Sequence, residues 1–285
     1  MATRLSELVG KKVTKVDEVV GDSVKAAVKG MKNGDIVMLE NVRFNPGETK
    51  NKPEFVKELV DCIHPDIYVN DAFGTAHRAH ASTVGVTAYT KVNLAGLLLD
   101  KELKFLYGAI DNPKRPLAAI VGGAKVSTKL PVLESLIDKC DKVLVGGGMM
   151  FTFYKAMGKT IGNSIVENDQ LELAMKLVDK AKNKGIDFLL PVDTVVTDSL
   201  EKQSVIKTVD IDHIPEGFLG ADVGPKTIKL FQDCLKDANT IVWNGHMGIF
   251  EQKAFSVGTM AIAKTLAERS DAGAITIVGG GDSVS

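Results

Sequence analysis

The sequence predicts an α/β fold built on parallel sheets, because short apolar segments alternate along it with longer segments of helical periodicity. Seven apolar segments are too short for helices, and their hydrophobicity is continuous rather than alternating. Such segments are typical of parallel strands that are covered on both faces. We expect these strands at residues 35–39, 66–69, 117–121, 142–145, 187–192, 240–243 and 274–278.

Helices are expected between these strands. The segment 168–184 begins with Asn168 as a helix cap, ends before Gly185, and places one apolar face toward a sheet. A similar pattern starts at Pro225, and another covers residues 255–268. Helices of this kind cover the faces of a parallel sheet.

The length and the proline pattern predict two domains. A chain of 285 residues is long enough for about two. Residues 91–110 have a helical pattern that must end before Pro113 and Pro116, because proline cannot continue a helix. We predict a first domain over residues 1–92, an interdomain helix and hinge over 93–112, and a second domain over 113–285. An ordinary connection between a helix and a strand is the alternative to a hinge.

Composition excludes several classes of function. The 35 Lys+Arg and 36 Asp+Glu residues give a formal net charge of −1, without the basic excess of a nucleic-acid-binding protein. No uncharged segment is long enough to cross a membrane, and early charges leave no apolar signal segment. The three cysteines lack metal-ligand spacing and are expected to be reduced thiols. We expect a cytoplasmic monomer.

Glycine-rich turns follow four strands of the second half, at 122–123, 146–148, 245–248 and 279–281. The carboxyl ends of parallel strands meet at one sheet edge, and glycine lets backbone amides approach a phosphate there. Lys125 and Lys129 lie on one helix face if both are helical, and two such cations favour a bound anion. Asp282 is a candidate ligand for Mg²⁺, which needs only one or two carboxylates besides phosphate oxygens. A helix cap is the alternative role for Asp282.

The first half carries basic side chains in place of glycines. Arg43 follows one predicted strand, and His77, Arg78 and His80 follow the next. A guanidinium group matches the oxygens of a carboxylate or a phosphate, so these residues predict a site for a small anion. Either histidine alone is better explained as a loop residue with satisfied hydrogen bonds.

Other chemistries lack their motifs. The sequence contains no GxSxG, no HExxH and no dinucleotide-binding GxGxxG. What remains is a site for phosphates and Mg²⁺ in one domain and a site for a small anion in the other. Phosphoryl transfer needs mainly positioning and charge neutralisation, which lysines, amides and Mg²⁺ supply. The sequence therefore predicts a kinase that acts on a small acidic metabolite.

The motifs resemble those of phosphoglycerate kinases from about residue 4 to the end of the chain. In the order of that family, the sequence contains LENVRF, NDAFGTAHRAHAS, GGAKVSTK, GGGMMFTF, ADVGPKTI, WNGHMGIFE and GGGDS. The resemblance implies two Rossmann-like domains. It also implies reversible transfer of the acyl phosphate of 1,3-bisphosphoglycerate to MgADP, which gives 3-phosphoglycerate and MgATP.

The resemblance also implies roles for individual residues. Arg43 and Arg78, with His77, would bind the phosphoglycerate. Lys125, Lys129 and Gly280 would act on the transferring phosphoryl group, and Lys129 would also contact the nucleotide phosphates. Asp282 would bind Mg²⁺. The remaining nucleotide contacts implied by the family are Gly146, Gly147, Gly148, Gly220, Asn244, Glu251, Gly279, Gly281 and Ser283.

Four features depart from the family pattern. A VDFNVP-like strand and an HxGRP-like loop are absent before the first motif, and an STGGGA-like turn is absent after the last. We therefore expect an incomplete first domain with an exposed sheet edge, in a chain shortened at both ends. His246 replaces the usual proline of WNGP. A catalytically inactive nucleotide-binding remnant is the alternative function, and a nicotinamide dehydrogenase is a more distant one.

Overall fold

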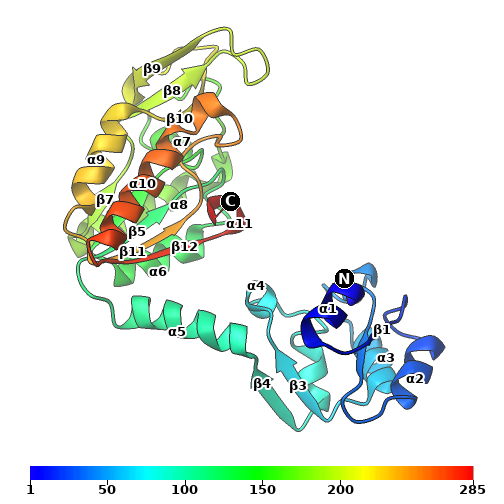
Figure 1. The fold of residues 1–285 in the computed structure, drawn as a ribbon. Coiled ribbons are helices and arrows are strands. Elements are labelled where there is room, and N and C mark those ends of the chain that lie inside the picture. Colours follow the sequence, from blue (N-terminus) through cyan, green and yellow to red (C-terminus); the bar gives the residue numbers. More distant parts are fainter. Residues whose placement is uncertain (285) are drawn as a thin grey trace. The chain divides into compact units, whose positions relative to one another are not determined.

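The computed structural model describes residues 1–284, which form two compact units. The first unit is Met1–Phe105 and the second begins at Leu106. Helix α5 (Leu97–Asp111) carries the chain from one unit into the other (Figure 1). No helix in the described part of the chain is long and apolar enough to cross a membrane.

The first unit contains two separate sheets, each of two parallel strands. Val13 pairs with Ile36 in the first sheet, and Ile67 pairs with Val92 in the second. The elements of this unit before α5 are α1 (Ala2–Val9), β1 (Val13–Lys15), α2 (Asp22–Lys29), β2 (Ile36–Met38), η1 (Val42–Phe44), α3 (Pro53–Ile63), β3 (Ile67–Asn70), α4 (Phe73–Ala76), η2 (Gly85–Tyr89) and β4 (Val92–Ala95).

Helix α3 supplies much of the apolar core of this unit. Pro53 lies in its first turn, where the missing N–H group has no helical partner to lose, and Glu54 suits the positive end of the helix dipole. Its buried residues are spaced to lie on one face, and they are Phe55, Val56, Leu59 and Cys62. This face fixes the segment before α3 and the segment before η2, and these two segments carry the basic residues described below.

The second unit is a five-stranded parallel sheet with a smaller antiparallel sheet beside it. The strand orders are β12-β11-β5-β6-β7 and β10-β8-β9. The elements after α5 are β5 (Leu117–Val121), α6 (Leu130–Lys139), β6 (Lys142–Val145), α7 (Met150–Ala156), η3 (Asn168–Gln170), α8 (Leu171–Lys184), β7 (Asp187–Leu189), β8 (Asp193–Thr197), β9 (Ile206–Asp210), η4 (Ile211–His213), β10 (Leu219–Val223), α9 (Pro225–Leu235), β11 (Thr240–Asn244), η5 (Lys253–Phe255), α10 (Val257–Asp271), β12 (Ile275–Gly279) and α11 (Gly281–Val284).

The central strand β5 shows why its sequence is continuously apolar. Ala118 and Ile120 belong to one hydrophobic cluster, whereas Leu117, Ala119 and Val121 belong to another. Because successive side chains of a strand point to opposite faces, the two clusters lie on the two faces of the sheet. Helices α9 and α10 contribute to the first cluster, and α6 and α8 to the second. The α/β fold class with parallel sheets is therefore confirmed.

Two local predictions were wrong. Residues Val92–Ala95 form strand β4 rather than the first turn of a helix, because they pair with β3, and helix α5 begins only at Leu97. Asn168 does not cap α8. It belongs to the short turn η3, and Gln170 precedes the helix without a capping hydrogen bond from its side chain. Gly185 does end α8, in the left-handed conformation with φ of 66°.

Candidate functional site

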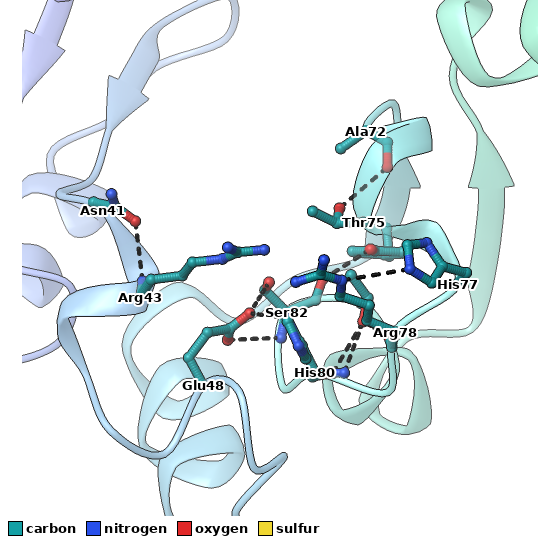
Figure 2. Close-up of polar contacts among 11 residues, drawn as sticks. Asn41, Arg43, Glu48, Ala72, Thr75, His77, Arg78, His80 and Ser82 are labelled. Carbon is teal, nitrogen blue, oxygen red and sulfur yellow. Dashed lines mark hydrogen bonds and ion pairs between the residues drawn. The ribbon is translucent and has the colours of Figure 1, made fainter. Parts of the chain in front are cut away.

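The basic residues of the first unit lie on two segments that face each other in Figure 2. Arg43 lies in η1, where Asn41 Oδ1 accepts a hydrogen bond from its main-chain N–H at 3.0 Å. His77 and Arg78 follow helix α4, and the N–H of Arg78 donates to the carbonyl of Thr75 at 2.9 Å. Figure 2 shows the side chains of Arg43 and Arg78 extending toward each other from these two segments.

The charges of this arginine cluster (Arg43, His77 and Arg78) are not neutralised within the described chain. All three residues are exposed, and none of the carboxylates whose side chains are described forms an ion pair with them. Arg78 Nε lies 3.4 Å from His77 Nε2 and donates to it. Guanidinium groups without an acidic partner are suited to a carboxylate or a phosphate, and an anion site at this cluster stays a prediction.

His80 differs from the other basic residues because it is buried. Its Nδ1 atom lies 3.8 Å from Glu48 Oε1, and both side chains are almost entirely inaccessible. His80 therefore lies in the packed interior next to the arginine cluster and not on its exposed face.

In the second unit, four glycine turns meet at the carboxyl edge of the parallel sheet. They are joined by main-chain hydrogen bonds from Gly122 to Asn244 (2.9 Å), from Gly123 to His246 (3.0 Å) and from Gly147 to Met247 (3.1 Å). The N–H of Gly245 donates to Ser283 Oγ at 2.9 Å, which connects the last turn to the others. The convergence predicted from strand order thus holds in the described residues.

Gly147 shows why these turns need glycine. Its φ is 69°, a conformation that side chains rarely adopt, and an added Cβ atom would lie 2.5 Å from the nitrogen of Gly123. The turns are packed backbone against backbone, so that their peptide groups rather than side chains form the surface at this edge.

An apolar cavity of about 310 Å³ lies beside these turns. Gly147, Gly148 and Gly220 line it, as predicted for nucleotide contacts, together with Phe151, Leu219 and His246. Gly146 and Glu251 do not line it. Gly146 is buried behind the cavity against the Met247 side chain, and Glu251 is exposed.

The two lysines of the GGAKVSTK segment have different surroundings. Helix α6 begins only at Leu130, so Lys125 lies in the preceding turn and the two lysines do not share a helix face, contrary to the conditional prediction. Lys129 Nζ donates to Asn244 Oδ1, and burial lowers the pKa of the Lys129 ammonium group. Lys125 is exposed, and it forms no ion pair with the side chains that the structure describes.

The last turn places Gly280 and Ser283 beside Asn244. Strand β12 ends at Gly279, and Gly280 has a φ of 92° before helix α11 starts at Gly281. The side chain of Asp282 lies outside the described part of the structure. Among the residues that the structure describes, no group of three or more His, Cys, Asp and Glu side chains could hold a metal.

His246 is an unpredicted anchor of the 245–250 turn. Its Nδ1 atom lies 2.7 Å from the carbonyl oxygen of Gly248, which can only accept, so Nδ1 carries the proton. The imidazole also packs on the Phe250 ring, with 5.2 Å between ring centroids. The side chain thus restrains the 245–250 turn.

Comparison with known proteins agrees with this arrangement. Residues 1–285 match the protein family described as phosphoglycerate kinase. A phosphoglycerate kinase from Trichodesmium erythraeum is 58% identical over 281 residues, which are 99% of this chain and 70% of the relative. A chloroplastic phosphoglycerate kinase from Volvox carteri is 57% identical over 284 residues, 61% of its length.

The fold comparison gives the same class. The structure of phosphoglycerate kinase from Coxiella burnetii matches with a TM-score of 0.81 and 42% identity, over 99% of this chain and 70% of that one. A two-unit α/β protein with unpaired arginines on one unit and glycine turns at the sheet edge of the other has the features expected of a small-molecule kinase. The chain belongs to the phosphoglycerate kinase family.

Proposed function

We propose that this protein transfers the acyl phosphate of 1,3-bisphosphoglycerate reversibly to MgADP, giving 3-phosphoglycerate and MgATP. Membership of the phosphoglycerate kinase family is the observation that carries this proposal. The substrates are small molecules, ATP or ADP among them. The unpaired arginines and the glycine-lined sheet edge supply the two kinds of anion site that this reaction needs.

The first unit would bind phosphoglycerate. Arg43 and Arg78 present guanidinium forks that match the carboxylate and phosphate oxygens of this substrate, and His77 lies beside Arg78. We assign residues 1–92 to this phosphoglycerate-binding domain and residues 93–112 to the interdomain segment.

The predicted second domain, residues 113–285, would bind the nucleotide. The apolar cavity between Gly147, Gly148 and Gly220 suits a flat aromatic base. Lys129, Lys125 and the amides of the final turn would face the phosphates. A cationic ammonium group stabilises the charge on a phosphoryl group in transfer. Gly146, Asn244, Glu251 and Gly279–Ser283, which the family resemblance predicts as nucleotide contacts, complete the proposed set.

Mg²⁺ would arrive as part of the nucleotide substrate. The described residues offer no cluster of carboxylates that could hold the ion by protein groups alone. Mg²⁺ commonly keeps phosphate oxygens and waters as ligands and takes only one or two carboxylates, and we assign Asp282 as the single protein ligand.

We further propose a monomer in a reducing compartment such as the cytoplasm. Cys62, Cys140 and Cys234 are free thiols, and the first two are buried. Light scattering of the purified chain tests the oligomeric state, and cell fractionation tests the location.

A coupled assay tests the function. Activity should require both ATP and 3-phosphoglycerate, and Lys129→Ala should reduce kcat by at least about 100-fold, because a transition-state charge loses its partner. Lys182→Ala, which removes an exposed lysine of α8, is the matched control and should keep full activity. Calorimetric titration with MgADP and 3-phosphoglycerate separately completes the test. Binding of MgADP alone, without turnover, would replace the kinase with a nucleotide-binding remnant.

A further inference from the structure

Glu48 is a buried carboxylate beneath the arginine cluster. Its residue is only 1% exposed, although it lies in the loop between η1 and α3 at the surface of the first unit. A buried carboxylate is costly unless hydrogen bonds or a cation compensate it. The contacts of Glu48 therefore indicate the structural role of this carboxylate.

The main chain of Glu48 also bonds to Asn45 and Asn51 of its own loop, but its side-chain contacts all reach one other loop. Glu48 Oε2 accepts from the N–H of Ser82 at 3.0 Å, and Oε1 accepts from Ser82 Oγ at 2.6 Å. The main-chain carbonyl of Glu48 accepts from the N–H of Ala81 at 2.9 Å, and His80 Nδ1 lies 3.8 Å from Oε1. Figure 2 shows Glu48 and Ser82 directly below the space between the two arginines.

These bonds join the two segments that carry the arginines. Arg43 lies shortly before Glu48, and Arg78 lies shortly before Ser82. Neither guanidinium group forms an ion pair within residues 1–284 that would fix its own position. The spacing between the two arginines consequently depends on how the loops are fastened below them.

We propose that Glu48 is a positioning residue for phosphoglycerate, which fastens residues 80–82 to the 41–48 segment so that Arg43 and Arg78 converge on one anion. The inference rests on the proposed function, in which these arginines bind 3-phosphoglycerate. A site that is ordered before binding does not lose the free energy of ordering its loops when the ligand arrives. Removing the hydrogen bonds of Glu48 therefore weakens the binding of 3-phosphoglycerate, although Glu48 itself does not contact the ligand.

The direction in which Glu48→Ala changes the Kd for 3-phosphoglycerate distinguishes a positioning role from a purely electrostatic one. Removing a negative charge near two arginines strengthens anion binding if charge alone matters. Positioning predicts the opposite, because Glu48→Ala frees the arginine-bearing loops. We expect Glu48→Ala to raise the Kd for 3-phosphoglycerate by about tenfold while the Kd for MgADP stays unchanged.

Two further variants test the hydrogen bonds themselves. In Glu48→Gln the side-chain oxygen can still accept from the Ser82 N–H, and the amide can donate to Ser82 Oγ, which also accepts. This variant should keep the Kd within about threefold of the wild-type value. Ser82→Ala removes only the hydroxyl contact and should raise the Kd by about two- to fivefold, even if Glu48→Ala fails to fold. Glu58→Ala, an exposed carboxylate on α3, is the control and should have no effect.

Two measurements decide the outcome. Calorimetry on the full chain gives the two dissociation constants, and hydrogen exchange gives the protection of amides 80–82, which should be lost in folded Glu48→Ala and kept in Glu48→Gln. Unchanged protection, or tighter 3-phosphoglycerate binding in folded Glu48→Ala, overturns the inference. If wild-type protein or Arg43→Ala shows that the arginines do not bind 3-phosphoglycerate, the proposed function fails, and Glu48 loses its role in binding as well.

Discussion

The His246 side chain helps to shape the apolar cavity beside the glycine turns, to which we assign the nucleotide. It lines that cavity, and its Nδ1 proton is donated to Gly248 across the turn that forms one wall. We expect His246→Ala to raise the Kd for MgADP by about three- to tenfold, since one hydrogen bond is worth about 1 kcal/mol. His246→Asn places an amide donor near the position of Nδ1 and should recover most of the affinity. Titration calorimetry with MgADP checks this, and equal losses in both variants would contradict it.

Lys129 gives the reaction a pH dependence whose sign is fixed by burial. Burial lowers the pKa of its ammonium group, so the charge is lost at a lower pH than for an ordinary lysine. Activity should fall as the pH rises through the alkaline range. Lys129→Arg stays charged at every accessible pH and should show a lower kcat without this alkaline decline. A pH profile of kcat for both proteins is the measurement, and the same decline in both would assign it to another group.

At the scale of elements, Asp222 of strand β10 binds the first turn of helix α10. Its carboxylate accepts from the N–H of Gly258 and from that of Val223, both at 2.8 Å, and burial raises its pKa to about 6. The folded state therefore binds this proton more tightly than the unfolded state, whose carboxyl titrates near 3.8. The stabilising contribution is complete below pH 3.8 and is lost as the pH rises through about 6.

This linkage predicts a difference between the wild type and a variant. A shift of about two pH units corresponds to about 3 kcal/mol, so between pH 4 and pH 7 the wild type should lose up to about that much more unfolding free energy than Asp222→Asn. Urea unfolding followed by Trp243 fluorescence at a series of pH values measures it. Asp271→Asn, an exposed carboxyl at the other end of α10, should keep the wild-type slope. Identical slopes in wild type and Asp222→Asn would be incompatible with a buried titrating carboxyl.

The elements also show how far the sequence predicts this fold. All seven predicted apolar segments form strands. Burial on both faces holds for β5, whose residues are all buried, but not for β3 and β12, which keep exposed residues. The apolar pattern does not predict the sheet β10-β8-β9, because its buried positions include the polar residues Asp193 and Thr194. Their hydrogen-bond partners lie in distant segments, which the sequence pattern does not reveal. Basic residues and glycines identify a candidate site by type. The residue type of Glu48 does not identify it as part of the site, because its hydrogen-bond partner Ser82 comes close to it only in the folded chain.

At the scale of the molecule, the two units differ greatly in the size of their cores. The first unit holds two small clusters around Phe55 and Val24, and its sheets have only two strands each. Its second sheet leaves paired apolar residues exposed on one face, at Ile67, Val69, Val92 and Leu94. Isolated two-stranded sheets are marginal in stability. The second unit instead has two extensive clusters, one on each side of its sheet.

This difference predicts unfolding in two steps, with the first unit unfolding at lower urea. Trp243, the single tryptophan, is buried in β11 and reports on the second unit alone, whereas far-ultraviolet circular dichroism reports on both. The dichroism signal should therefore begin to fall before the tryptophan fluorescence changes. Val24→Ala creates a cavity in the first unit and should move only the early transition, and Ile262→Ala should move only the late one. Coincident curves, displaced together by either substitution, would mean that the two units unfold as one cooperative structure.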